Sequence, residues 1–95
     1  MKRRYEGIIV LNTKGKEETP EALFEAVSRE LEEEGAMIGD VEHLGRREFA
    51  YNARHLEAGH YVKFGFEADP GVVASARVRL KLNETVFLQH YQRLS

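Results

Sequence analysis

Arginines and tyrosines that fall on predicted strands are the residues of this chain best suited to bind a ligand. They form three short groups, residues 4–6, 45–51 and 59–61. An arginine guanidinium donates hydrogen bonds to phosphate oxygens, and a tyrosine ring stacks on a nucleotide base. None of the groups has the residue types of a catalytic centre. We therefore expect a surface that binds nucleic acid and catalyses no reaction.

The pair Arg46-Arg47 follows Gly45 on a predicted strand, so its two side chains should point to opposite faces and at least one should reach solvent. Either the pair contacts phosphate through its planar donor forks, or it only keeps the surface soluble. Tyr61 shares a face with Lys63 and is the best stacking candidate, whereas a strand tyrosine is otherwise half buried in the core. The predicted RNA-binding residues are Lys2, Arg3, Arg4, Arg46, Arg47, Tyr51, Arg54, Tyr61 and Lys63.

The spacing of the polar residues does not support a catalytic or metal site. His43, His55, His60 and His90 have no ligand spacing, and no Ser-His-Asp or paired-carboxylate arrangement stands out. The chain has no cysteine, which excludes disulfides, thiolate chemistry and a cysteine zinc site. Residues 12–16 have one glycine and no arginine, unlike the anion loop of small acyl-phosphate hydrolases. We expect no enzyme activity, no cofactor and no bound metal.

Charge is distributed unevenly along the 95 residues, which are enough for one domain, 1–95. Residues 17–34 hold eight of the 16 acids and one basic residue, so the rest of the chain has eight acids against 13 Lys and Arg. The net charge of −2 therefore conceals a basic remainder that can face RNA. No long apolar run or signal-peptide pattern is present, which favours a cytoplasmic location.

The hydrophobic pattern predicts the order β-α-β-β-α-β. Thr19-Pro20 and Asp69-Pro70 each begin a helix with an N-cap and a proline, and Gly35 ends the first helix. Expected strands are 4–12, 36–51, 60–68 and 85–91, with a loop at 52–58. This is an α+β, ferredoxin-like split βαβ fold, with a four-stranded antiparallel sheet and both helices on one face. The other face of the sheet is expected to be open.

Taken in order, these motifs resemble the bacterial small-subunit ribosomal protein S six (S6) family. The family begins with a basic residue before Arg-Tyr-Glu, matched by residues 3–6, and its first strand ends in Leu-Asn, matched by Leu11-Asn12. Its second strand carries glycine, two basic residues, an apolar residue and Ala-Tyr, matched within 45–51. Gly59-His60-Tyr61 matches the opening of the third strand. Leu88 stands where the family commonly has arginine.

This resemblance implies a structural component of the small ribosomal subunit. It implies binding to small-subunit ribosomal RNA as a heterodimer with ribosomal protein S eighteen (S18), and a cytoplasmic, ribosome-associated location. It also implies no catalytic activity and no cofactor.

Two other functions fit the same fold class. Tyr61 and Lys63 on an open face are compatible with an RNA-binding regulatory module that acts off the ribosome, although residues 59–64 only partly match the aromatic consensus of RNA-recognition motifs. An acyl-phosphate hydrolase is supported by the fold alone.

Overall fold

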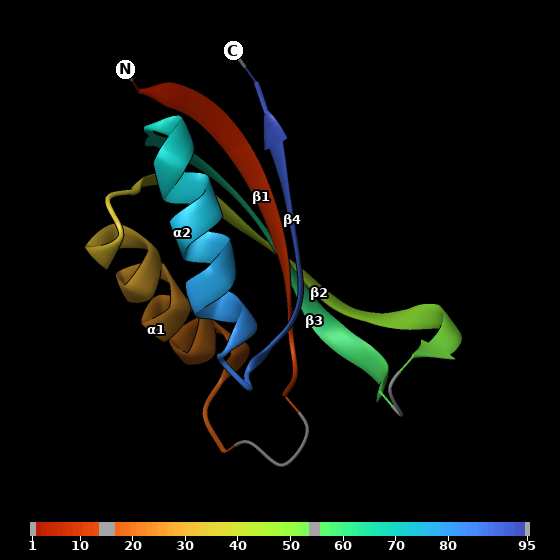
Figure 1. The fold of residues 1–95 in the computed structure, drawn as a ribbon. Helices are drawn as coiled ribbons and strands as arrows, with labels where there is room; N and C mark the ends of the chain where they lie inside the picture. The colour runs from red at the N-terminus through yellow and green to blue at the C-terminus, as the bar shows by residue number, and fades with distance from the viewer. Residues whose placement is uncertain (1, 14–16, 54–55, 95) are drawn as a thin grey trace.

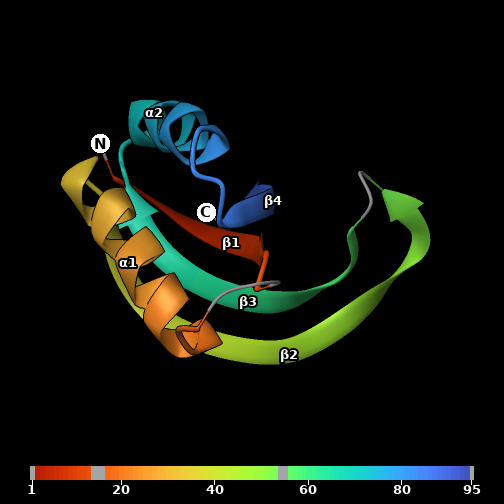
Figure 2. The ribbon, with the colours of Figure 1, turned by 90° about the horizontal axis from the view of Figure 1, so that it is seen from below.

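A four-stranded antiparallel sheet with two helices on one face forms the molecule (Figures 1 and 2). The computed structural model describes residues 2–13, 17–53 and 56–94, without the side chains of 47–53 and 56–58. The elements are β1 (Arg3–Leu11), α1 (Pro20–Glu33), β2 (Met37–Ala53), β3 (Leu56–Ala68), α2 (Pro70–Lys81) and β4 (Val86–Arg93). The strand order is β2-β3-β1-β4. The predicted ferredoxin-like fold is confirmed, and within the described ranges no helix is long and apolar enough to cross a bilayer.

The core lies between the sheet and the helices and follows the alternation of the strands. Apolar residues of β1 and β3 face the helices, and a helical stripe from α1 and α2 covers them. The largest fully buried side chains are Ile9, Leu11, Val27, Leu31, Val62, Phe64 and Leu80. Gly7 lies directly opposite Phe64 across the β1–β3 pair, and the Phe64 ring occupies the space above it. The alternation of both strands therefore places their apolar side chains toward the helices.

Both helices begin where the sequence predicts. Thr19 has extended backbone angles, and its Oγ1 accepts a hydrogen bond from the Ala22 backbone N–H at 3.2 Å. At the other end of α1, Gly35 has φ 110°. The N–H of Gly35 donates to the Glu32 carbonyl, and the N–H of Ala36 donates to the Leu31 carbonyl, both at 3.0 Å. These two bonds form a Schellman motif, which needs the left-handed conformation that glycine adopts without strain.

The β2–β3 hairpin is longer than predicted and projects past the helices (Figure 1). The expected loop at 52–58 is wrong, because β2 continues to Ala53 and β3 begins at Leu56. Backbone pairing extends along the hairpin, with Glu48 opposite Ala58 and Ala53 opposite Leu56. Ladder hydrogen bonds use backbone groups, so a stretch without an alternating apolar face can still pair as strands.

Irregularities in β2 and β4 decide which side chains reach each face. The β2–β3 register shifts near Gly39 and again near Gly45, where φ is 88°. Glycine is common at such bulges, where the strand bends. In β4 the register shifts as well, since Leu11 pairs with Val86 while Val10 pairs with Leu88.

Phe87 is the extra residue of that β4 bulge. Val86 and Tyr91 therefore both pack on the core despite their odd spacing. The bulge explains why the alternation of this strand is ambiguous in the sequence.

Candidate nucleic-acid interface

Three of the predicted RNA-binding residues lie on the open face of the sheet, away from the helices. Arg4 is exposed on β1, and Tyr61 and Lys63 are half-buried on β3. Cross-strand pairing places Tyr61 opposite Val10 and Lys63 opposite Ile8. Neither Ile8 nor Val10 belongs to the core cluster. The Lys63 ammonium also lies 3.5 Å from a carboxylate oxygen of Glu6.

Arg46 lies on the other face of the sheet. It is exposed, and its backbone pairs with His60, which alternates with Tyr61 and so shares the side of the helices. Its neighbour Arg47 pairs with Gly59 through the backbone. The side chains of Arg47 and Tyr51, and the whole of Arg54, fall outside the described residues. The structure therefore does not bring Arg46 together with Tyr61 and Lys63.

Lys2 and Arg3 lie at the end of the sheet where β1 begins and β4 ends. Lys2 is exposed and Arg3 is half-buried. Arg93 of β4 pairs with Tyr5, and the next N–H, that of Leu94, donates to the Arg4 carbonyl at 2.8 Å. Antiparallel pairing thus places Arg93 beside the basic start of the chain. Sequence reasoning missed Arg93, because nothing local connects residue 93 with residues 2–4.

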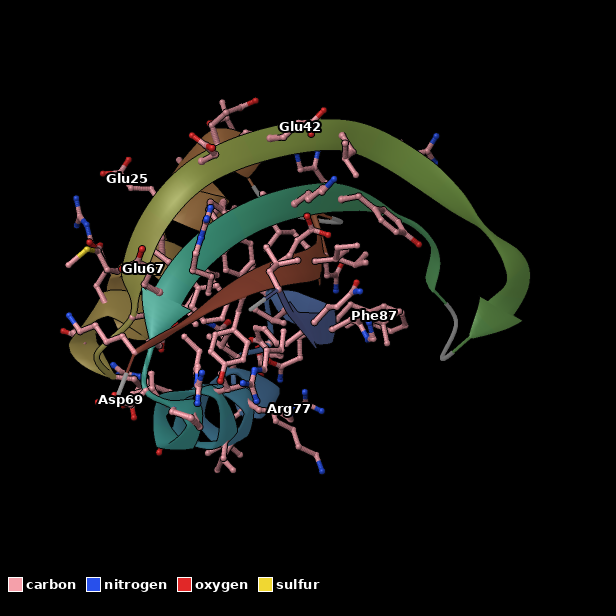
Figure 3. All side chains as sticks on the ribbon, turned by 90° about the horizontal axis from the view of Figure 1, so that it is seen from above. Glu25, Glu42, Glu67, Asp69, Arg77 and Phe87 are labelled. Atoms are coloured by element: carbon pink, nitrogen blue, oxygen red, sulfur yellow. The ribbon has the colours of Figure 1, made fainter. Side chains whose placement is uncertain are left out.

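A second missed basic residue is Arg77, which projects from α2 (Figure 3). Its guanidinium carbon lies 5.2 Å from the centroid of the Tyr91 ring, within the range of a cation–π interaction. The Gln89 side chain links β4 to α2: its amide N–H donates to the Arg77 carbonyl at 2.9 Å, and its amide oxygen accepts from the Tyr91 hydroxyl at 2.6 Å. Burial raises the pKa of Tyr91 to about 12, although the Arg77 charge acts in the opposite direction. A sequence signal existed, because residues 70–82 carry three basic residues and no acid.

Arg79 is basic too, but its charge is used inside the protein. Its guanidinium donates to Glu33 at 2.6 Å, to Glu34 at 3.0 Å and to Glu30 at 3.4 Å. These hydrogen bonds, chiefly those to Glu34 and Glu33, raise the pKa of Arg79. These carboxylates lie at the C-terminal end of α1, where the helix dipole is negative, and the last turn of α1 has no basic residue to balance them. Arg79 supplies the missing cation from α2.

Two histidines that are distant in sequence meet on the helix-facing side of β2 and β3. His43 Nδ1 and His60 Nε2 are 3.0 Å apart, and the His43 ring packs edge-on against Phe24 at 5.9 Å. One of the two nitrogens must carry the proton that they share. Burial, followed by the neighbouring His43, lowers the pKa of His60, while Glu21 opposes the shift. Across the described residues no group of three or more His, Asp or Glu side chains could hold a metal ion.

Two adjoining hollows lie on the open face, between β2 and the end of β4. Their volumes are about 240 and 260 Å³, and they share Arg4, Asp40, Gly65 and Leu94. The charged residues that line them are four carboxylates and two cations: Glu6, Asp40, Glu42, Glu67, Arg4 and Lys63. Figure 3 shows Glu42 on β2 and Glu67 near the end of β3. This part of the open face is thus net acidic rather than basic.

Comparison with known proteins shows that the chain is similar to members of one protein family. The family model for ribosomal protein S6 matches residues 4–89. The small ribosomal subunit protein bS6 of Akkermansia muciniphila is 47% identical over 92 residues, covering 97% of this chain and 98% of that protein. The corresponding protein of Synechococcus sp. is 31% identical over 91 residues, covering 95% and 94%. The crystal structure of 30S ribosomal protein S6 from Thermotoga maritima superposes with a TM-score of 0.86 at 25% identity, covering 99% of this chain and 89% of that one.

Proposed function

Because this chain belongs to the bacterial ribosomal protein S6 family, we propose that it binds small-subunit ribosomal RNA together with ribosomal protein S18. The observation that carries the proposal is the match of one family over residues 4–89, which is nearly the whole chain. The proposed role is structural, since the protein positions RNA and a neighbouring protein and catalyses no reaction. Its location is the small ribosomal subunit in the cytoplasm.

The distribution of charge supports contact with RNA phosphates. The acids of 17–34 are concentrated on and around α1, whereas exposed basic residues lie on other elements: Lys2, Arg4, Arg46, Arg77, Lys81 and Arg93. Glu25 on α1 and Arg77 on α2 lie well apart (Figure 3). Separation of the charges allows a sub-neutral protein to present cations to a polyanion. We assign phosphate contacts to the basic residues among those predicted and add Arg77 and Arg93 to them.

A salt series tests the predicted contacts directly. Each lost phosphate contact lowers the slope of log K against log salt by about 0.7 to 0.9. The double substitution Arg46→Ala with Arg47→Ala is expected to weaken binding to small-subunit ribosomal RNA and to reduce that slope by roughly 1.4 to 1.8, because two contacts are removed. Arg29→Ala is the control, since Arg29 sits on the acidic helix and pairs with Glu25 at 2.8 Å. An unchanged affinity and slope in the double variant would remove Arg46 and Arg47 from the interface.

The location is tested in cell extract. On a sucrose gradient the protein is expected to sediment with small ribosomal subunits. If it stays at the top and binds short single-stranded RNA in a manner abolished by Tyr61→Ala, the off-ribosome regulatory module is the better description.

A further inference from the structure

We propose that the hydrogen bond between His43 and His60 is a proton-operated clasp at the base of the β2–β3 hairpin. The clasp is closed while the two facing nitrogens share one proton. It opens when both rings are cationic, and the part of the hairpin next to it then loosens. The inference goes beyond the proposed function and does not depend on it, because the free protein in solution tests it.

The pair lies where the sheet narrows to two strands. His60 pairs with Leu11, which is the last residue of β1. His43 is the last β2 residue before the register shift at Gly45. Among the described residues, β2 and β3 pair only with each other beyond this point, and Figure 2 shows them continuing past the end of β1. A two-stranded ribbon is only marginally stable by itself, so a side-chain bond at its base helps to hold it in register.

The geometry of the two rings is that of a shared proton. His43 Nδ1 and His60 Nε2 lie 3.0 Å apart. The ring centroids lie 5.2 Å apart, close to the largest value that this N···N distance allows, so each nitrogen points at the other. A nearly linear N–H···N hydrogen bond needs one proton between the two nitrogens. The bond can therefore form when both rings are neutral or when one is cationic, but not when both facing nitrogens carry a proton.

The surroundings keep the clasp closed near neutral pH. The His43 ring packs edge-on against Phe24, which is 3% exposed and anchors this side of the pair to α1. Burial and the neighbouring His43 lower the pKa of His60. Among the described charged side chains, Glu21 at the start of α1 favours a proton on His60, whereas Arg46, opposite His60 on the same face, disfavours it. The proton that makes His60 cationic is therefore bound at lower pH than in an isolated histidine.

Opening of the clasp acts first on the backbone pairs beside it. Two cationic rings at this distance repel each other and have lost their hydrogen bond, so the link between β2 and β3 is removed. The next backbone pairs along the hairpin are Arg46 with His60 and Arg47 with Gly59. These pairs should open more often at low pH, while the four-stranded part of the sheet keeps its core contacts.

Histidine titration followed by NMR tests the clasp itself. In the free protein, the ring signals of His43 and His60 are expected to titrate in two coupled steps separated by about one pH unit or more. In His43→Gln the remaining His60 should titrate in a single step, and so should His43 in His60→Gln. Independent single-step titrations of the two rings in the unsubstituted protein would overturn the inference.

Amide hydrogen exchange tests the effect on the hairpin. Protection of the amides of 46–48 and 58–60, corrected for the intrinsic exchange rate at each pH, should fall about threefold or more between about pH 7 and pH 5, while protection in β1 stays unchanged. The fall should disappear in both His43→Gln and His60→Gln. His55→Gln is the matched control, because it removes the other histidine between residues 43 and 60 and should keep the fall.

Three results of the exchange experiment contradict the clasp. One is an unsubstituted protein whose hairpin protection does not change with pH. Another is a fall of equal size in His43→Gln and His60→Gln, which would assign the pH response to other groups. The third is a loss of the response in His55→Gln.

Discussion

Replacement of Gly7 by alanine tests the close contact at the centre of the core. Gly7 of β1 lies opposite Phe64 of β3, and an added Cβ would lie 2.5 Å from Phe64 Cζ and 2.9 Å from Cε1. Ordinary contacts begin near 3.4 Å, so the ring must move by nearly an ångström. Phe64 is 1% exposed, and its ring centroid lies 5.3 Å from that of Phe24 and 5.5 Å from that of Phe66. These neighbouring rings restrict the movement of the Phe64 ring. Gly7→Ala therefore overpacks the core.

The expected size follows from two opposing effects. Overpacking of a buried site costs about 1–3 kcal/mol. Alanine also reduces the conformational freedom of the unfolded chain, which offsets about 0.4–1 kcal/mol. The net loss in the free energy of unfolding is about 1–2 kcal/mol, which corresponds to a fall in Tm of roughly 4–15 °C for a domain of this size. Urea titration and thermal unfolding monitored by circular dichroism measure both quantities.

Two further variants separate the clash from other effects. Gly65→Ala makes the same change on a neighbouring strand, where the new Cβ has ordinary contacts, and should leave stability unchanged or slightly raised. Phe64→Leu removes the ring atoms that would clash with the new Cβ. The double variant Gly7→Ala with Phe64→Leu should therefore lose less free energy of unfolding than the two single variants lose together, by about 0.5 kcal/mol or more. If Gly7→Ala unfolds no earlier than the unsubstituted protein, or if the losses add, the explanation for glycine at this position is wrong.

Three further predictions concern charge. Arg79→Met should destabilise the protein, because it leaves the carboxylates at the end of α1 without a compensating cation, and the loss of stability should be smaller in about 1 M salt. Arg29→Met, which removes an exposed ion pair with Glu25, is the control. Equal losses in the two variants would contradict the stabilising role of the Arg79 ion pairs. Because the pKa of His60 is lowered in the folded state, stability should be full above about pH 6.5 and decline as the pH falls; an unchanged acid profile of urea midpoints in His60→Gln would refute this. Because the pKa of Tyr91 is raised to about 12 in the folded state, stability is complete below about pH 10 and is lost as the pH rises toward 12, and Tyr91→Phe should flatten that alkaline decline.

Local patterns in the sequence predict most of the elements because each depends on neighbouring residues. The alternation around Ile9 and Val62 identifies the buried faces of two strands, and a capping threonine followed by proline begins α1. Gly35 ends that helix because the Schellman motif requires a left-handed residue. The prediction for 52–58 failed because backbone pairing in the hairpin leaves no trace in side-chain alternation.

The candidate interface was only partly predictable, because a face of the molecule is assembled from several strands. Arg46, Tyr61 and Lys63 were all expected to bind RNA, and this stays a prediction. A bulge at Gly45 and the strand register place Arg46 on the helix side, and Tyr61 and Lys63 on the other. Arg93 reaches the basic start of the chain only through the pairing of β4 with β1.

The amino-acid sequence by itself determined the order of the elements, the faces that they bury, and the family to which the chain belongs. Periodicity, capping residues and motif order are local properties, so they can be read without coordinates. The tertiary structure alone decided that His43 meets His60, that Arg79 bridges to α1 and that the β4 bulge turns Leu88 toward the open face. Each of these depends on strand register or on contacts between residues far apart in the chain. A shift of one residue in register would move every side chain of a strand to the opposite face.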